Sequence, residues 1–469
     1  MDKKEVDDLK DQLFLNKRAG WDDASDDEKR EIYEFADDYM YYLNRSKTEK
    51  EIIENSKDIL LKNGFRDIKE LEKVEPGDRV YYINRDRNIY AAVIGENGLQ
   101  DGLNVVGAHS DSPRLDLKQN PLYENSGLAL FKTHYYGGIK KYQWVTIPLA
   151  MHALFVKENG ERIRATWGED ENESTFVISD ILPHLGQDQA SRKSNETIKG
   201  EELNILVGGN PLGDSKSPDS VKLNIMKILN EKYGITEIDF TSSDIEFVPA
   251  MKARSVGFDG SMVGGYGQDD KVCCYTALRG ILNVHNPKKT AVCVLTDREE
   301  VGFMGVTGME SHAWERFVVE LLEKAGQNSL NMVEKVFEKS TVLSADVTAA
   351  YDPTFADAFE KRNDAAFGMG VAISKYGGSR GKSGGSEAQA ELIAKVRDIF
   401  GKVGCKYQSA ELGKVDKGGG GTIALTFANR NMDVVDCGVP VMAMHSPYEL
   451  THKFDIYQAY KGYEAFYKS

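Results

Sequence analysis

Apolar positions in residues 5–62 recur every three or four residues in a highly charged background. This spacing puts the apolar side chains on one face of a helix, which is the pattern of a helix packed against a protein core. We therefore expect the N-terminal segment to be helical. The positions that carry the spacing are Ile32, Phe35, Tyr39, Tyr42, Ile52, Ile53, Ile59 and Leu60.

Three short apolar runs at 80–83, 89–94 and 103–108 follow this segment, separated by turn residues of the types Asn, Asp and Gly. Runs of this length between turn residues are typical of β-strands. The third run is of the buried type and ends at His109. The sequence thus predicts three strands, the last of them in the interior of a sheet.

Beyond residue 252, helical and strand-like segments alternate along the chain. We expect a helix at 271–285, a strand at 290–296, a helix at 313–325 and a strand at 341–345. Alternating helices and buried strands indicate an α/β sheet domain.

The region between residues 113 and 252 has a different pattern, with short strand-like pieces and charged loops rich in turn residues. A chain of 469 residues exceeds the usual size of one hydrophobic core, so about two or three domains are expected. We assign residues 1–112 and 253–469 to one α/β domain and residues 113–252 to a β-rich domain inserted into it.

Charge and apolar content restrict the possible partners. The net charge of −15 is opposite to the basic surface that nucleic-acid binding requires. Hydrophobic residues make up 41% and charged residues 28%, as in ordinary globular proteins. No segment approaches the ~18 apolar residues that span a bilayer, and Met1–Asp8 lacks the apolar core of a signal peptide. We predict a cytosolic protein that binds neither nucleic acid nor membranes, with its five cysteines reduced and structural.

Polar residues gather at five points where strand-like runs end. In open α/β sheets, ligands bind beyond the carboxyl ends of the strands, so a site would form at such points. Imidazole and carboxylate groups are usual ligands of divalent metals, and a set without cysteine is typical of catalytic zinc sites. The clusters are His109-Ser110-Asp111, Gln268-Asp269-Asp270-Lys271, Glu299-Glu300, Ser344-Ala345-Asp346 and Met444-His445-Ser446.

The adjacent acids Glu299 and Glu300 follow the apolar run at 290–295. Neighbouring side chains on a strand point to opposite faces, so the two carboxylates share one site only if the strand opens into a loop here. One acid would then bind a metal while the other moves a proton. A solvated acidic turn is the alternative for an isolated pair, and Asp346 alone is compatible with a turn cap. The coincidence of five clusters favours a metal site.

Five segments in a fixed order resemble the signature of a known family. They are Gly107-Ala108-His109-Ser110-Asp111-Ser112-Pro113, Gln268-Asp269-Asp270-Lys271, Arg298-Glu299-Glu300-Val301-Gly302, Leu343-Ser344-Ala345-Asp346 and Ala443-Met444-His445-Ser446. In order and spacing they are similar to the M18 metalloaminopeptidases, the aspartyl-aminopeptidase-like enzymes, over most of the chain. The resemblance implies a three-layer α/β/α catalytic domain with a mixed sheet and an inserted β-rich dimerisation domain.

The same resemblance implies a site for two divalent metal ions bridged by the carboxylate of Asp269. His109 and Asp346 would complete the binding of one ion, and Glu300 and His445 that of the other. Zinc is expected, with cobalt and manganese as alternatives.

Two further acids of the site would act without binding metal. Asp111 would hydrogen-bond the imidazole of His109 and fix its tautomer. Glu299 would be the general base that takes the proton of the attacking water and returns it to the leaving amine. Spacing alone leaves Asp270 open as the bridge, and Asp352 and His452 open as competing ligands.

Three features match the substrate site of the family. The loop around His184 resembles the segment from which family members extend a histidine into the neighbouring subunit's active site, where it would polarise the substrate carbonyl; an ordinary surface loop is the alternative. Gly420 and Gly421, in a run of four glycines, would let backbone amides approach the substrate, and a flexible loop is the alternative. Lys375 would favour acidic N-terminal residues.

We therefore expect a two-metal aminopeptidase that releases the N-terminal residue of peptides. The resemblance also implies dimers that assemble into a homododecamer. A metal-dependent N-acyl amino acid deacylase or carboxypeptidase is the second hypothesis; it would need an arginine for the substrate carboxylate, such as Arg114, Arg254 or Arg380. A non-catalytic metal-bound scaffold is the third, and the presence of Glu299, which has no structural duty, argues against it.

Overall fold

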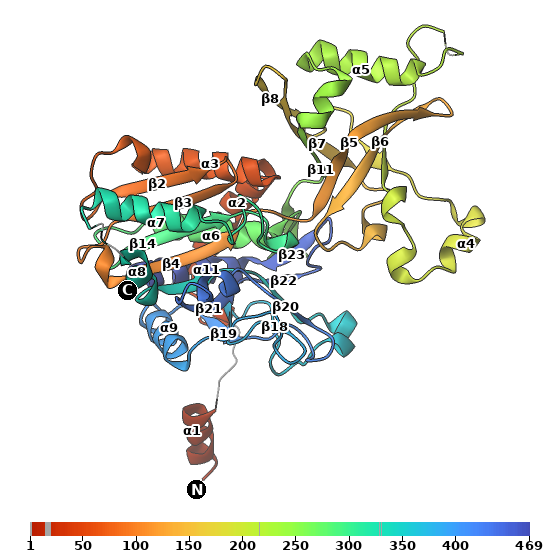
Figure 1. Ribbon diagram of the computed structural model, residues 1–469. Coiled ribbons are helices and arrows are strands. Elements are labelled where there is room, and N and C mark those ends of the chain that lie inside the picture. Colours follow the sequence, from red (N-terminus) through yellow and green to blue (C-terminus); the bar gives the residue numbers. More distant parts are fainter. Residues whose placement is uncertain (1, 15–19, 215, 328, 330) are drawn as a thin grey trace.

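A nine-stranded mixed sheet forms the centre of the larger part of the protein (Figure 1). The computed structural model describes residues 2–14, 20–214, 216–327, 329 and 331–469. Strands β14 (Thr290–Thr296), β4 (Leu103–His109) and β15 (Thr341–Ser344) are parallel neighbours at its centre, so their carboxyl ends meet at one edge. On either side lie β1 (Arg66–Asp67), β2 (Arg79–Asn84), β3 (Asn88–Val93), and β21 (Asp433–Gly438), β17 (Val371–Ser374), β19 (Tyr407–Ser409).

Alternate side chains of the central strands enter separate cores on the two faces of this sheet. On β14, Ala291, Cys293 and Leu295 belong to one core, and Val292 and Val294 to the other, as the period of two along a strand requires. The sheet is thus covered by helices on both faces, and the predicted α/β class with a mixed sheet is confirmed. The first core includes α2 (Asp26–Arg45), α3 (Glu49–Lys62), α6 (Gln268–Leu282), α9 (Ala390–Lys402) and α11 (Lys453–Tyr467), and the second α7 (Ala313–Lys324), α8 (Met332–Glu338) and α10 (Ala424–Ala428).

A seven-stranded antiparallel sheet projects from this body (Figure 1). It has a core of its own, in which Phe131, Phe155 and Phe247 are buried. We propose that this unit is the inserted domain of residues 113–252. In spatial order its strands are β8 (Arg162–Trp167), β7 (Leu149–Val156), β11 (Asp244–Pro249), β5 (Arg114–Asn125), β6 (Leu128–Tyr136), β10 (Asn204–Gly208) and β9 (Val177–Ile178), accompanied by α4 (Gln187–Ala190) and α5 (Ser220–Tyr233).

A five-stranded sheet brings distant parts of the chain to the carboxyl edge of the central sheet. Its strand β13 (Met262–Gly265) leads into α6, and the connection from β22 (Pro440–Met442) to β23 (Glu449–His452) carries His445. The remaining elements are β12 (Arg254–Val256) and β16 (Thr348–Ala349) of the same sheet, the pair β18 (Gly378–Ser379) and β20 (Gly419–Gly420), and helix α1 (Lys3–Leu13).

The structure bears on two features considered in the sequence, membrane-spanning segments and the cysteines. Within the described parts of the chain, no helix has the length and apolar content to cross a membrane. The five cysteines are free and buried, which fits a structural role. The cytosolic location itself stays a prediction.

Candidate metal centre

The carboxylate of Asp269 lies between two histidine side chains. Its Oδ1 is 3.1 Å from Nε2 of His109, and its Oδ2 is 3.1 Å from Nε2 of His445. Asp269 does not end a strand, as the sequence suggested, but stands in the first turn of α6, where its backbone and that of Asp270 are not helical. The peptide bond between these two aspartates is cis. With an oxygen 3.1 Å from each Nε2, the carboxylate of Asp269 faces both imidazoles.

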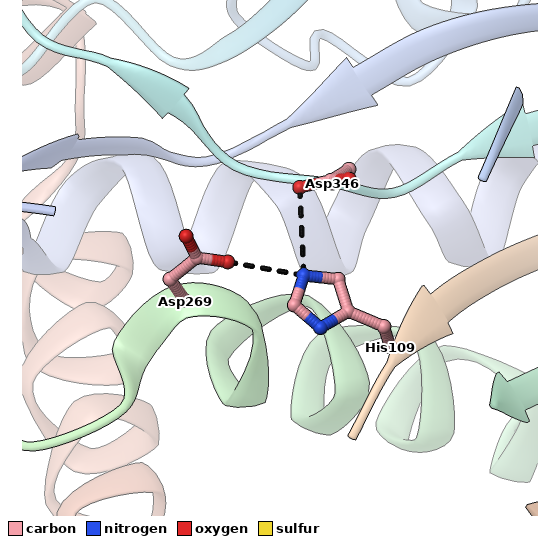
Figure 2. Close-up of side chains that lie close together, drawn as sticks. All are labelled: His109, Asp269 and Asp346. Carbon is pink, nitrogen blue, oxygen red and sulfur yellow. Dashed lines mark ion pairs between the residues drawn. The ribbon is translucent and has the colours of Figure 1, made fainter. Parts of the chain in front are cut away.

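Two groups of possible metal ligands share Asp269. In the first, Oδ1 of Asp346 lies 3.8 Å from Nε2 of His109, as Figure 2 shows. In the second, Oε2 of Glu300 lies 3.3 Å from Nε2 of His445. Within each group the ligand atoms lie within 4.8 Å of one another. The structure thus brings together the five residues that the sequence named as metal ligands.

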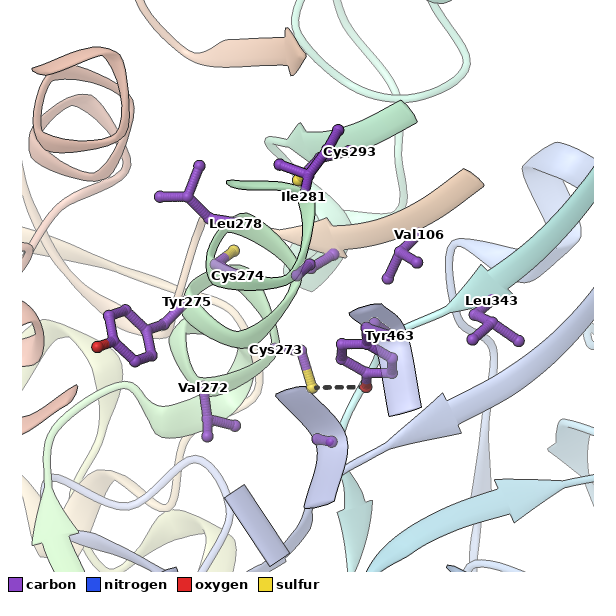
Figure 3. Close-up of a cluster of buried hydrophobic side chains, with 14 of the residues drawn as sticks. Val106, Val272, Cys273, Cys274, Tyr275, Leu278, Ile281, Cys293, Leu343 and Tyr463 are labelled. Carbon is purple, nitrogen blue, oxygen red and sulfur yellow. Dashed lines mark hydrogen bonds between the residues drawn. The ribbon is translucent and has the colours of Figure 1, made fainter. Parts of the chain in front are cut away.

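Helix α6 holds Asp269 on a rigid base. The helix is buried on nearly all sides, between the sheet, α2 and α11, and Figure 3 shows its side chains packed among those of the core. Tyr463 of α11 contacts it through a hydroxyl 4.0 Å from Sγ of Cys273. A helix enclosed in this way carries apolar residues all round, and its first turn has little freedom to move.

The cluster brings several carboxyl groups together in a buried site. Burial raises the pKa of Glu300 and Asp346 well above the usual range, and the carboxylates nearby add to the shift. Among the described residues, Oε1 of Glu300 is buried and accepts no hydrogen bond, and Oδ1 of Asp269 is buried beside Nε2 of His109. Buried carboxylate oxygens without partners are costly unless a cation binds them. The donor set of imidazole and carboxylate groups therefore fits divalent metal ions such as zinc.

Glu299 lies beside this cluster and belongs to neither ligand group. Strand β14 opens here into the turn Glu299–Val301, with Arg298 in the left-handed region at φ 70°, so both acids face the same site. Oε2 of Glu299 is 4.0 Å from Nε2 of His109, and its side chain is 15% exposed, against 3% for Glu300. Burial raises the pKa of Glu299 to about 7, with Asp269 and Asp111 adding to the shift. Such a pKa suits proton transfer near neutral pH.

Asp111 is buried and connects His109 with the acid pair. Nδ1 of His109 donates to the backbone carbonyl oxygen of Asp111 at 3.0 Å and lies 3.3 Å from the carboxylate oxygen Oδ1 of the same residue. The backbone N–H groups of Glu299 and Glu300 donate to the two carboxylate oxygens of Asp111, at 3.1 Å each. Burial alone would raise the pKa of Asp111, but the hydrogen bond and charge of His109 hold it below its ordinary value. The carboxylate thus orients residues of both the His109 segment and the Glu299 segment.

Glu449 plays a similar part on the opposite side, and sequence reasoning missed it. Its carboxylate accepts the backbone N–H of His445 at 2.7 Å and that of Asp269 at 3.1 Å. Nδ1 of His445 lies 2.8 Å from the carbonyl oxygen of Gly138, so this nitrogen donates and Nε2 is left facing the cluster. The available signal was a carboxylate four residues after a candidate histidine.

The competing candidates Asp270, Asp352 and His452 belong to neither group of possible metal ligands. Asp270 accepts the backbone N–H of His109 at 3.2 Å. Asp352 caps the short helix that follows it, and His452 caps α11. These three residues have other hydrogen-bonding roles in the structure.

A cavity of about 470 Å³ opens beside Asp346. Gly420 of strand β20 lines it, and Gly421 directly follows this strand. Lys375 is exposed and is not among the lining residues, whereas Arg380 and Lys382 are. His184 lies exposed on the short helix Pro183–Leu185 of the second sheet's unit, and within this chain it is in neither ligand group.

Comparison with known proteins gives consistent matches along the whole chain. The family model for aminopeptidase I zinc metalloproteases (M18) matches residues 42–467. A probable M18 family aminopeptidase 1 from Clostridium acetobutylicum is 47% identical over 458 residues, which cover 97% of this chain and 98% of that protein. The crystal structure of an M18 family aminopeptidase from Thermotoga maritima superposes with a TM-score of 0.93 at 41% identity, covering 97% of this chain and 99% of that one.

More distant structures share the fold alone. The mApe1 dodecamer of S. cerevisiae superposes with a TM-score of 0.74 at 19% identity, over 92% of this chain and 96% of that one.

Proposed function

The chain belongs to the M18 family of zinc aminopeptidases, and we propose that it removes N-terminal residues from peptides with two zinc ions bound around Asp269. The observation that carries the proposal is the position of this carboxylate, with one oxygen 3.1 Å from Nε2 of His109 and the other 3.1 Å from Nε2 of His445. One carboxylate placed in this way can bridge two ions.

In this proposal His109 and Asp346 would hold one ion, Glu300 and His445 would hold the second, and Asp269 would contribute to both. The buried Oε1 of Glu300, which accepts no hydrogen bond among the described residues, and the buried Oδ1 of Asp269 beside His109 support the assignment. Zinc bound here would polarise the scissile carbonyl and lower the pKa of water.

We assign the proton transfers to Glu299. It lies beside the cluster, and burial raises its pKa to about 7. It belongs to neither of the two groups of possible metal ligands. Its carboxylate takes a proton from the water that attacks the scissile carbonyl. The same proton then passes from Glu299 to the nitrogen of the leaving peptide, which restores the base. Asp111 holds the backbone of Glu299 in place during both steps.

We propose that the side chain of the N-terminal residue occupies the cavity beside Asp346. Arg380 and Lys382 line this cavity and would attract an acidic side chain. Lys375, which the sequence named for this role, is exposed and precedes strand β18. A preference for acidic N-terminal residues is therefore assigned to the cavity as a whole.

We also propose that the protein forms homo-oligomers, dimers first and a dodecamer from them. The support is the shared fold with a protein that is a dodecamer. In such an assembly, His184 would reach a neighbouring subunit's site, which agrees with its exposed position.

The alternative hydrolases require an arginine that binds a substrate carboxylate in the site. Arg114 is instead surrounded by Glu49, Asp116 and Glu246, and Arg254 is exposed on β12. Arg380 is the one of the three candidates that lines the cavity. The family match, and not the arrangement of arginines, therefore favours the aminopeptidase.

The test combines metal content with substrate class. We expect two zinc ions per chain, rapid turnover of aminoacyl arylamides, fastest for aspartyl and glutamyl compounds, and loss of turnover with a chelator. N-acyl amino acids serve as the competing substrates. Turnover of the acylated series alone would contradict the aminopeptidase, and full activity with one ion per chain would contradict the bridged pair.

A further inference from the structure

Tyr136 ends strand β6 of the second sheet, yet its hydroxyl reaches the candidate metal centre. The hydroxyl donates to Oδ2 of Asp111 at 2.8 Å, and the side chain is 9% exposed. The second sheet therefore contributes a polar group directly behind the site, from a residue that the sequence analysis did not single out.

The hydroxyl completes the surroundings of the Asp111 carboxylate. Oδ2 accepts from Tyr136 and from the backbone N–H of Glu300, while Oδ1 accepts from the N–H of Glu299 and faces Nδ1 of His109. Without the hydroxyl, Oδ2 would lose one of these two donors. The carboxylate would then have more freedom to rotate away from the imidazole. A small rotation would shift His109 and the acid pair together.

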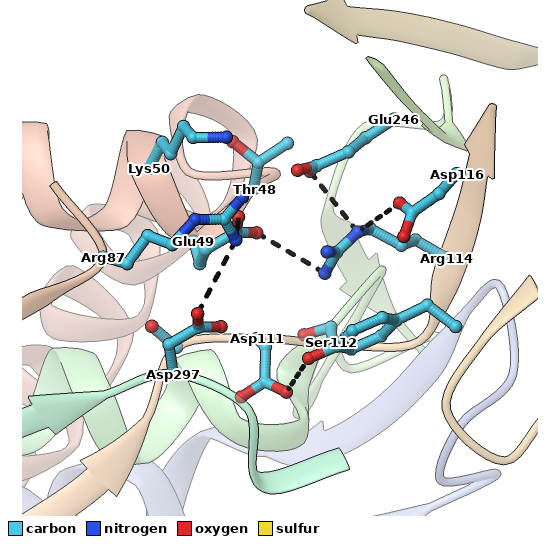
Figure 4. A network of polar contacts seen from close by, with 12 residues as sticks. Thr48, Glu49, Lys50, Arg87, Asp111, Ser112, Arg114, Asp116, Glu246 and Asp297 are labelled. Carbon is cyan, nitrogen blue, oxygen red and sulfur yellow. Dashed lines mark hydrogen bonds and ion pairs between the residues drawn. The ribbon is translucent and has the colours of Figure 1, made fainter. Parts of the chain in front are cut away.

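A buried ion-pair network fixes the ring that carries this hydroxyl. The guanidinium of Arg114 lies 3.9 Å from the centre of the Tyr136 ring, a favourable arrangement of a cation over an aromatic face. Arg114 is itself held by Asp116 at 2.8 Å, Glu49 at 3.4 Å and Glu246 at 3.6 Å, as Figure 4 shows. Acidic residues from α3, β5 and β11 thus hold Arg114, and Arg114 in turn holds the ring of Tyr136.

The same strand end also contacts the other half of the site. The carbonyl of Gly138, two residues beyond Tyr136, accepts from Nδ1 of His445 at 2.8 Å. Residues 136–138 therefore contact Asp111, which adjoins His109, and also contact His445. Any displacement of this segment would disturb both groups of ligands.

We propose that Tyr136 is a positioning residue, whose hydroxyl holds the carboxylate of Asp111 in the orientation that presents His109 and the Glu299 backbone to the site. This inference rests on the proposed function, because it assigns a role within the same metal centre. If the tyrosine served packing alone, the ring would suffice, since the ring and not the hydroxyl contacts Arg114.

The substitution Tyr136→Phe removes the hydroxyl and keeps the ring. We expect kcat for an aminoacyl arylamide to fall about tenfold, KM to change less than about twofold, and zinc to be lost to a competing chelator about tenfold more readily, as for other groups that orient metal ligands. The matched control is Tyr135→Phe, the same change on the opposite face of β6, where the side chain is 41% exposed. It should behave like the unaltered protein. Circular dichroism and thermal unfolding establish that each variant is folded.

A double-mutant comparison tests whether Tyr136 acts through Asp111. In an Asp111→Asn background, adding Tyr136→Phe should change kcat and zinc retention less than about twofold, because coupled residues are not additive. The inference is overturned if Tyr136→Phe matches Tyr135→Phe in both measurements, or if its effect is undiminished in the Asp111→Asn background. Failure of the proposed function is a separate result: the zinc-loaded protein would not cleave arylamides, while the comparison of zinc retention would still decide the role of Tyr136.

Discussion

Single buried carboxylates organise the candidate site without belonging to either ligand group. Asp111 accepts the backbone N–H groups of Glu299 and Glu300, and Glu449 accepts those of His445 and Asp269. Each acid thereby fixes the backbone of residues whose side chains face the cluster. A site supported in this way needs little rearrangement to bind metal.

Replacement of Glu299 by Gln separates proton transfer from metal binding. The substitution Glu299→Gln should lower kcat for aminoacyl arylamides about 10³-fold, because an amide cannot accept the proton of water. Zinc content, measured by mass spectrometry of the metal, should stay unchanged. Glu310→Gln, at an exposed acid of the following loop, is the control and should keep full activity. Retained turnover would exclude Glu299 as the base, and loss of zinc would make it a ligand.

Most residues of the cluster could be named from the sequence, since imidazole and carboxylate groups follow strand-like runs there. Spacing alone could not decide between Asp269 and Asp270, and the choice of Asp269 rested on the family resemblance, because the orientation of the two side chains depends on the irregular backbone at the start of α6. Glu449 and Tyr136 were missed for another reason. Glu449 accepts the backbone N–H of Asp269, and Tyr136 donates to Asp111, and neither contact between separate segments is visible in the local sequence; the four-residue spacing from His445 was the signal available for Glu449.

At the scale of elements, strongly patterned segments were predictable and short ones were not. Strand β14 lies where the apolar run at 290–296 predicted a strand, and α7 lies within the helix expected at 313–325. The five-stranded sheet was not predicted, because strands as short as β16, with two residues, carry no periodic signal. Its strands find their partners through distant contacts, which depend on the whole fold.

A buried charge cluster joins strand β7 to helix α3. Nδ1 of His152 lies 2.6 Å from Glu51, and Nε2 lies 3.1 Å from Glu169. Lys47 and Lys252 also contact Glu169, at 3.6 Å and 2.6 Å. Burial alone would lower the pKa of His152, but the two carboxylates outweigh it and raise the pKa to about 9. The imidazolium therefore binds its proton more tightly in the folded protein.

This pKa shift predicts a loss of stability at alkaline pH. The unfolded histidine titrates near 6.5, so the stabilisation is complete below pH 6.5 and disappears as the pH rises through about 9. The contribution lost to the free energy of unfolding is about 3 kcal/mol. Urea unfolding between pH 6 and 10 should show this loss, and His152→Gln should remove it. The control His312→Gln, at a histidine with a 97% exposed side chain, should retain it. Parallel pH profiles for His152→Gln and the unaltered protein would contradict the assignment.

At the scale of the whole molecule, the second sheet's unit extends away from the body (Figure 1). It carries exposed apolar side chains. Ile181, Leu182 and Leu185, around His184, are 47%, 50% and 69% exposed. Apolar side chains gathered on a projecting segment are typical of a surface that another chain covers. They support a homo-oligomer built through this unit.

Substitution of one of these side chains tests the assembly. Leu185→Asp should shift the protein toward monomers in sedimentation velocity, because a charge would be buried in the proposed interface. Leu61→Asp, at a 47% exposed leucine on α3, serves as the control and should leave the mass unchanged. A monomeric unaltered protein, or an unchanged mass for Leu185→Asp, would contradict the proposed oligomer.

The placement of Asp269 between two imidazoles also bears on how the protein is made. His109 is translated early, the whole second sheet follows before Asp269 emerges, and His445 comes from a much later segment. A nascent chain on the ribosome therefore holds only fragments of the cluster for most of its synthesis. The proposed metal centre can therefore be completed only at a late stage of maturation, when the C-terminal segment that carries His445 has docked on the sheet that the earlier strands began.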